Sequence, residues 1–294
     1  MIRTFLVVML GYVLLAHCAP LGAADNIIFT ELTDTGVTIA GTKTKLPPPI
    51  MGDGLDGAAQ TKVLESIATP AKPVAELTRK SVVAPFVLKI DEGSGTLKRV
   101  DAFFVVYGEL DRLMEDGFKK LDDGPGDAGP MKDPALKSNG ELLDEKTLAA
   151  RGIKVAGEHE TIAHSYFPIF DRLKLHATLR SIDTRGKDSV LLAAKVDERF
   201  NKDEKYGNFW QALKRDDAGK LSIAPAQHPY TAAISYAKAT QLVEPKGAIF
   251  VEYHLAFEEP AGWFNGAKLL TSKLPIAAQS NIRKLRQQLE KEAK

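Results

Sequence analysis

The alternation of hydrophobic and polar residues between Thr231 and Leu289 is the most regular pattern in the chain. From Ala248 onward every second residue is apolar, and Glu252 and His254 lie between these residues. The apolar positions are Ile249, Val251, Tyr253, Leu255 and Phe257. A period of two with one apolar side predicts a half-buried β-strand.

The segments on either side of this strand complete the pattern. The preceding segment, 231–243, reads as a partner strand across a tight turn at Glu244–Gly247, and small residues occupy one of its sides: Ala233, Ser235, Ala237 and Ala239. The segment from Asn265 reads as a helix with an apolar stripe formed by Leu274, Ala278, Ile282, Leu285 and Leu289. The small side of the partner strand leaves room for this helix, although Pro275 is expected to kink or restart it.

Hairpin patterns recur earlier in the chain. Residues 173–179 and 190–196 alternate as two strands around a loop at 184–188, and strands are also predicted at 82–90 and 99–107. The unbroken apolar run 102–107 is typical of a strand that is covered on both faces. Shorter helices are expected at 56–68, where Asp56 is the N-cap, at 110–121 and from about Asp144 to Gly152.

Strong hairpins with helices near the ends predict an α+β fold, namely a curved antiparallel β-sheet that grips a long C-terminal helix. We expect three parts: a signal peptide over 1–24, an N-terminal extension with a short helix over 25–77, and a single α+β domain over 78–294. A Gly-, Asp- and Pro-rich stretch within this domain predicts a flexible loop at 122–140.

The first 24 residues have the features of an export signal. Arg3 precedes a short apolar run, Phe5–Ala16, and small residues at 22–24 fit a cleavage site before Asp25. The run is too short to cross a bilayer, which takes about 20 residues. We therefore expect an exported protein, periplasmic or secreted, with no transmembrane helix in the mature chain. Cys18 lies in a lipoprotein-like context, but His17 departs from the small residue usual there, so lipid anchoring is the less favoured alternative.

The amino-acid composition excludes some kinds of site and partner. The chain has 294 residues and one cysteine, Cys18, so a mature chain beginning at Asp25 has no disulfide or thiolate. Without Arg3, the remaining 38 Lys and Arg balance the 38 Asp and Glu. A neutral chain without a basic block lacks the electrostatic footprint of a nucleic-acid-binding protein, and none is expected as a partner.

The C-terminal part of the chain resembles a known family. The paired strands, the Pro260–Phe264 segment and the helix ending near Leu289 look like the end of a START-like (helix-grip) lipid-binding domain. The resemblance covers about 154–291 and lies in the pattern rather than in a motif. It implies a sheet wrapped around a C-terminal helix and a hydrophobic cavity between them, and it transfers no ligand-binding residue by position.

Two polar groups are candidates for chemistry. His159 and His164 lie five residues apart, which does not fit the four-residue spacing of a zinc-protease helix, and no metal site is predicted. Asp183, Asp197 and Arg199 belong to the densest charged group, which also includes Asp188. Carboxylates beside an arginine can carry out acid–base catalysis, but they more often form ion pairs that tie a strand to a loop.

These patterns favour a protein that binds a hydrophobic, lipid-like small molecule between the sheet and the C-terminal helix, without a cofactor. The candidate ligand-binding residues are Trp210, Tyr236, Tyr253, Trp263, Phe264, Leu274 and Ile282. Ordinary core packing of these side chains is the alternative interpretation. Two other functions stay open: a hydrolase or cyclase that uses the Asp and Arg group, and a structural or interaction module of the cell envelope. No catalytic residue is assigned.

Overall fold

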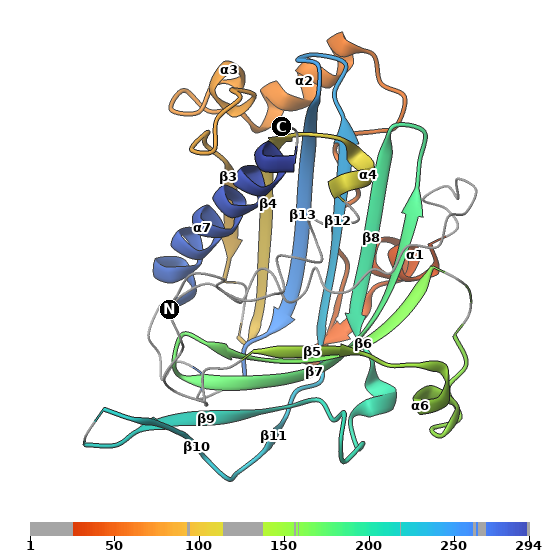
Figure 1. Cartoon of the computed structure of the whole chain (residues 1–294), viewed down its shortest axis with the longest axis vertical. Helices are drawn as coiled ribbons and strands as arrows, with labels where there is room; N and C mark the ends of the chain where they lie inside the picture. The colour runs from red at the N-terminus through yellow and green to blue at the C-terminus, as the bar shows by residue number, and fades with distance from the viewer. Residues whose placement is uncertain are drawn as a thin grey trace.

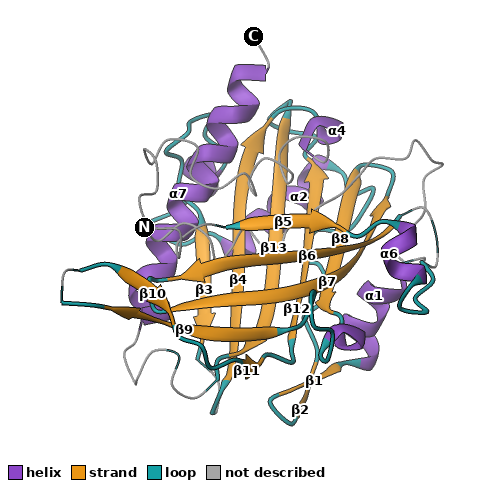
Figure 2. Cartoon of the chain, turned by 60° about the horizontal axis from the view of Figure 1, so that its bottom comes forward, coloured by secondary structure: helices purple, strands orange, loops and turns teal. Residues whose placement is uncertain are grey.

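The computed structural model describes residues 26–92, 95–113, 138–155, 157, 159–217, 219–260, 263 and 269–292. Its main feature is a large antiparallel sheet whose strands run in the order β10-β9-β7-β8-β12-β13-β4-β3, with β6 and β5 added beside β7 and β11 paired to β9 (Figures 1 and 2). The strands are β3 (Val87–Asp91), β4 (Leu97–Tyr107), β5 (Asn139–Leu142), β6 (Glu160–Ile169), β7 (Leu173–Arg185), β8 (Ser189–Val196), β9 (Phe209–Arg215), β10 (Leu221–Ile223), β11 (His228–Pro229), β12 (Ala233–Gln241) and β13 (Ala248–Glu258).

The β12–β13 hairpin is the centre of the sheet, as the sequence pattern predicts. Ala233 pairs with Phe257 at one end, and Gln241 pairs with Ile249 at the other. The odd-numbered side chains of both strands lie on one face, which we call the inner face, where small residues of β12 adjoin bulky residues of β13. The predicted small side of the first strand is therefore confirmed.

The expectation that β13 is half-buried is wrong. Ten of its eleven residues are buried, including Glu252 and His254 on the even-numbered side, which we call the outer face. The reason is a second layer formed by the N-terminal residues, which packs on the outer face of the strands. An alternating pattern shows that a strand has two different faces, but it does not show that the polar face meets water.

The N-terminal layer consists of short elements joined by extended segments. They are α1 (Ile27–Thr30), the π-helical turn η3 (Glu31–Thr35), the hairpin β1 (Val37–Ile39) and β2 (Thr42–Thr44), α2 (Gly57–Ile67) and α3 (Val74–Leu77). The predicted start of the second helix is confirmed, because the Asp56 side chain accepts a hydrogen bond from the Ala59 amide. Apolar side chains of this layer, such as Ile28 and Leu64, pack against outer-face residues of the sheet.

The long C-terminal helix α7 (Leu269–Glu292) lies on the inner face, beside β3 and β4 in Figure 1. The predicted apolar stripe of α7 is confirmed, because all five of its residues are buried in the inner core. The helix does not restart at Pro275, since α7 continues through this residue. Near the C-terminal end of α7, the Arg286 guanidinium donates to the carbonyl oxygens of Val105, Ala84 and Pro85 and so fixes the helix to the end of the sheet where β3 begins.

The sheet curves because one strand changes partners along its length. Residues 173–176 of β7 pair with β9, whereas residues 179–185 pair with β8. Thr178 lies at the change, and its amide donates to Asn208 Oδ1 over 2.7 Å. Asn208 Nδ2 donates in turn to the Asp197 carbonyl and to Asn201 Oδ1. The β5-β6-β7-β9 part of the sheet therefore turns across the end of the central strands (Figure 2).

Several other predicted elements differ from the structure. The hairpin around 184–188 is confirmed as β7 and β8, and the helix after Asp144 is confirmed as α6 (Glu145–Ala149). The strand expected at 82–90 begins only at Val87, and β6 and β9 lie in segments with no assigned strand. The helix expected at 110–121 is described only as α4 (Leu110–Arg112), and the rest lies outside the described residues. The same is true of most of the loop expected at 122–140, although β5 begins at Asn139.

Candidate functional site

A cluster of aromatic side chains lies on the inner face, in the same apolar core that α7 covers. Trp210 enters it from β9, Tyr230 from the segment before β12, and Trp263 from the connection to α7. The rings of Trp210 and Trp263 meet edge to face with centroids 6.2 Å apart, and Tyr230 stacks on Trp263 at 5.4 Å. On its other side, Trp210 stacks against the exposed His228 at 4.4 Å, so the cluster reaches the surface of the protein there.

Most of the candidate ligand-binding residues meet in this core. Trp210, Tyr253, Trp263, Leu274 and Ile282 are all buried in it. Tyr230 also belongs to the cluster, but sequence reasoning missed it because it lies in an irregular segment without periodicity.

Two candidate ligand-binding residues are not placed in this core. Tyr236 packs on the outer face instead, where its ring contacts Phe29 and His254. Phe264 lies outside the described residues.

The two buried tyrosines keep the inner core uncharged. Burial raises the pKa of Tyr230, and the nearby Glu258 and Tyr253 add to this effect. Burial also raises the pKa of Tyr253, against a smaller opposing effect of the Ser235 side chain. Both phenols therefore stay neutral at physiological pH, and they are suited to neutral hydrogen bonds rather than to proton transfer.

Among the buried polar groups of this core without a hydrogen-bond partner in the described residues are two nitrogen donors. They are the indole Nε1 of Trp210, whose residue is 7% exposed, and the amide Nδ2 of Asn281 on α7, whose residue is 5% exposed. Asn281 lies on the sheet-facing side of the helix, because Ala278 and Leu285, three residues before and four after it, are both in the inner core. A buried donor without an acceptor costs about 1–3 kcal/mol, so native proteins seldom keep one without a reason.

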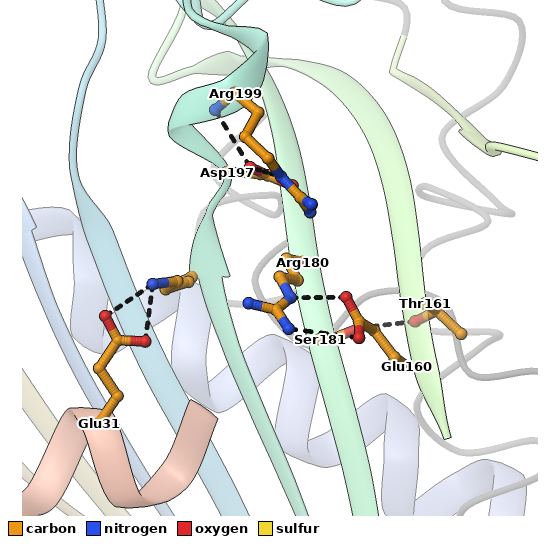
Figure 3. A network of polar contacts seen from close by, with 8 residues as sticks. Glu31, Glu160, Thr161, Arg180, Ser181, Asp197 and Arg199 are labelled. Carbon is orange, nitrogen blue, oxygen red and sulfur yellow. Dashed lines mark hydrogen bonds and ion pairs between the residues drawn. The ribbon is translucent and has the colours of Figure 1, made fainter. Parts of the chain in front are cut away.

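The Asp and Arg group does not form a single site. Asp197 forms a double ion pair with Arg199 at 2.6–3.1 Å (Figure 3), whereas Asp183 faces His159 at 3.3 Å. Asp188 accepts from the Gly54 amide at the end of the β7–β8 loop. These carboxylates each bind a different partner, as is typical of contacts that tie strands to loops.

Neighbouring charges on the outer face are paired in the same way. Glu160 binds Arg180 at 2.6 and 3.2 Å, and Glu31 of η3 binds Lys195 through both carboxylate oxygens at 2.7 Å (Figure 3). The second of these pairs joins the N-terminal layer to β8.

His159 and His164 also bind separate partners. His159 faces Asp183, and His164 Nδ1 lies 2.9 Å from Thr178 Oγ1. Burial lowers the pKa of His164. Within the described ranges, no group of three or more His, Cys, Asp or Glu side chains is arranged to hold a metal ion.

Comparison with known proteins gives fold-level likenesses only. No family model and no curated protein matches the chain. Among solved structures, the human StarD13 (DLC2) lipid transfer and protein localization domain matches with a TM-score of 0.38 and 8% identity, over 78% of this chain and 94% of that one. Human STARD10 matches with a TM-score of 0.35 and 9% identity, over 83% of this chain and 86% of that one.

A putative uncharacterized protein from Rhizobium leguminosarum matches with a TM-score of 0.31 and 11% identity, over 66% of this chain and 97% of that one. Likenesses at this level carry no argument about function. The topology itself confirms the predicted class: an α+β protein with a large antiparallel sheet and a long C-terminal helix on its inner face, the helix-grip arrangement. None of the described helices is long and apolar enough to cross a membrane.

Proposed function

We propose that the protein binds a hydrophobic small molecule on the inner face, between the sheet and α7, and that the ligand carries a hydrogen-bond acceptor such as a hydroxyl or carbonyl oxygen. The observation that carries this proposal is the pair of buried, unpartnered nitrogen donors, Trp210 Nε1 and Asn281 Nδ2, in a core whose other side chains are mainly aliphatic and aromatic. A ligand that supplies acceptors to these donors removes an energetic cost of the ligand-free protein.

The surroundings of the two donors favour a neutral ligand over an anionic one. The buried lysines that the structure describes, Lys174 and Lys238, occupy even-numbered positions of β7 and β12, on the side of the sheet away from the inner core. The nearest buried cation on α7, Arg286, is already bound to backbone carbonyls. A carboxylate brought into this core would have no opposite charge to offset its desolvation.

Replacing Asn281 by leucine, a side chain of nearly the same shape, separates the cost of the donor from its use. In the ligand-free protein Asn281→Leu is expected to raise the free energy of unfolding by about 1 kcal/mol, because an unpaired buried donor disappears. The same change, and likewise Trp210→Phe, is expected to weaken the binding of 1-dodecanol about fivefold, since a hydrogen bond worth about 1 kcal/mol is lost.

The measurements are chemical denaturation and a binding titration with matched 12-carbon probes. The hydrocarbon n-dodecane, which has no acceptor, should bind the Asn281→Leu variant and the wild type equally, and dodecanoate should bind the wild type more weakly than 1-dodecanol does. If the wild type binds none of the probes and Asn281→Leu is destabilising, the inner core is ordinary packing and the proposal fails.

We further propose that the protein is exported and acts outside the cytoplasm, which rests on the sequence pattern of residues 1–24 alone. N-terminal sequencing of the protein recovered from the producing cells is expected to begin at Asp25. A mature chain that begins with a lipid-modified Cys18 would replace this proposal with a membrane-anchored protein, and an uncleaved Met1 would contradict export through this signal.

A further inference from the structure

The extended segment Leu46–Asp56, here called the strap, crosses the outer face of the sheet and is held there by side chains of the strands. Tyr236 donates its hydroxyl to the Pro47 carbonyl over 2.7 Å. The Glu252 carboxylate accepts the amides of Ile50 and Met51 at 2.8 and 3.2 Å. Most of these contacts are made to the strap's backbone, so the strands recognise an extended chain rather than particular side chains.

Charged groups complete the attachment at the far end of the strap. Lys238 donates to the Met51 carbonyl and to Asp53 Oδ1 at 2.7 and 2.6 Å, and Ser189 also donates to Asp53. Asp53 packs against Gly186 in the β7–β8 loop so closely that a Cβ atom on this glycine would lie 2.3 Å from Asp53 Oδ2. The loop is therefore fitted to the Asp53 carboxylate.

A histidine lies directly behind the Glu252 carboxylate. His254 is 1% exposed and Glu252 is 0% exposed. His254 Nδ1 lies 2.7 Å from Asp101 Oδ1, and its Nε2 lies 3.6 Å from Glu252 Oε2. The imidazole thus stands between two carboxylates, one of which holds the strap, while the Asp101 side chain is 30% exposed and connects the group to solvent.

The other charged and titratable groups around this histidine are few. Tyr236 of β12 packs on the His254 ring at 4.7 Å, and Lys238 of β12 is directly opposite Glu252 in the sheet. Lys89 of β3 is opposite Asp101. The strap itself contributes two acidic residues: Asp53, which is bound to Lys238, and Asp56, which caps α2.

We propose that the strap is a pH-set latch, which His254 holds on the outer face while it is protonated between Asp101 and Glu252, and which it loosens when it becomes neutral. In the protonated state, Nε2–H points toward Glu252 Oε2 and offsets the charge of this buried carboxylate. When the proton of Nε2 is lost to solvent, Nδ1 keeps its proton toward Asp101, and the Nε2 lone pair faces Glu252. Two acceptors then oppose each other in a buried setting, which makes the Glu252 position less favourable.

The direction of the pH dependence follows from the same contacts. Burial acts to lower the pKa of His254, but the hydrogen bond to Asp101 and the nearby Glu252 carboxylate outweigh it, so that the pKa is raised above its usual value of about 6.5. A raised pKa means that the stabilisation is fully present below about pH 6.5 and is lost as the pH rises through the folded-state pKa.

At low pH the attachment of the strap through Asp53 depends on pH in the opposite direction. Burial acts to raise the pKa of Asp53, but the hydrogen bonds from Lys238 and Ser189 outweigh it, so the pKa is lowered from about 3.8. The contact of Asp53 is therefore retained above about pH 4 and is lost only as the pH falls through that lowered value. The strap is therefore held at pH values between the lowered pKa of Asp53 and the raised pKa of His254. It loosens when the pH rises above the pKa of His254.

Amide hydrogen exchange of the full chain tests the latch directly, because the Ile50 and Met51 amides are the groups that Glu252 binds. After correction for the intrinsic exchange rate, the protection of these two amides is expected to fall about tenfold for each unit by which the pKa of His254 is raised, as the pH passes through that pKa. The Thr178 amide, bound to Asn208 at the bend of the sheet, is the internal control. It should show no step above about pH 6.5, because the histidine beside it, His164, has a lowered pKa.

Variants separate the histidine from other titrations. His254→Gln is expected to abolish the step, whereas the matched control His176→Gln, at a half-buried histidine whose pKa burial lowers to about 4, should leave it unchanged. If His254→Gln does not fold, Asp101→Asn serves instead, and it should move the step to lower pH because one of the two carboxylates is gone. Protection that does not change with pH in the wild type, or a step that stays in place in Asp101→Asn and His254→Gln, would overturn the proposal.

Discussion

Removing the chain from Asn281 onward is expected to abolish cooperative folding. The deletion takes away Ile282, Leu285 and Leu289, all of them buried in the inner core against the sheet. Each such side chain contributes about 2–5 kcal/mol when it is replaced by alanine in a packed site. The three together approach the entire stability of an ordinary domain, which is about 5–15 kcal/mol.

A point variant tests the contribution of α7 in a protein that still folds. Leu285→Ala should lower the free energy of unfolding by about 2–5 kcal/mol in a denaturant titration, because it leaves a void under α7. Gln287→Ala, two residues away on the exposed side of the helix, is the matched control and should change it by less than about 0.5 kcal/mol. If the truncated chain melts at the wild-type temperature, α7 is not part of the core.

The second large effect is expected at the bend of the sheet. Asn208→Ala removes three hydrogen bonds at once, to the Thr178 amide, the Asp197 carbonyl and Asn201 Oδ1. Because Asn208 and Thr178 are buried, the groups left behind cannot turn to water, and the cost is expected to be about 3–5 kcal/mol.

The three hydrogen bonds of Asn208 also allow a comparison between Asn208→Asp and Asn208→Ala. Asn208→Asp keeps the acceptor for Thr178 but replaces the donor that faces two oxygens with a third oxygen, so it should destabilise the protein as strongly as Asn208→Ala does. Asn281→Leu, at a buried asparagine with an unpaired amide, should have the opposite sign. A mild effect of both Asn208 variants in thermal unfolding would show that the bend does not depend on this side chain.

The sequence predicts the elements best where periodicity and local capping act together. The β12–β13 hairpin, the β7–β8 hairpin, the Asp56 cap of α2 and the stripe of α7 all follow from residues near one another in the chain. Of the two outcomes expected at Pro275, a restart of the helix does not occur, because α7 continues through this residue.

The covered outer face could not be predicted in the same way. Glu252 and His254 look like solvent-facing residues in the pattern, and only the distant strap and Asp101 make their burial possible. For the candidate site, alternation places Tyr253 correctly on the inner face. Tyr236 occupies an even-numbered position of β12, and its side chain therefore lies on the outer face. Asn281 carried no signal in the sequence, because the lack of a partner is a property of the folded core.

Native mass spectrometry of the full-length protein, purified without denaturation and then incubated with 1-dodecanol, tests most directly whether the inner face holds a hydrophobic ligand. The expected spectrum shows the protein with one added ligand mass, which is weaker in Trp210→Phe and in Asn281→Leu and is lost when organic solvent unfolds the chain. A spectrum with the protein mass alone, for the purified protein and after incubation with the probe, would contradict ligand binding between the sheet and α7.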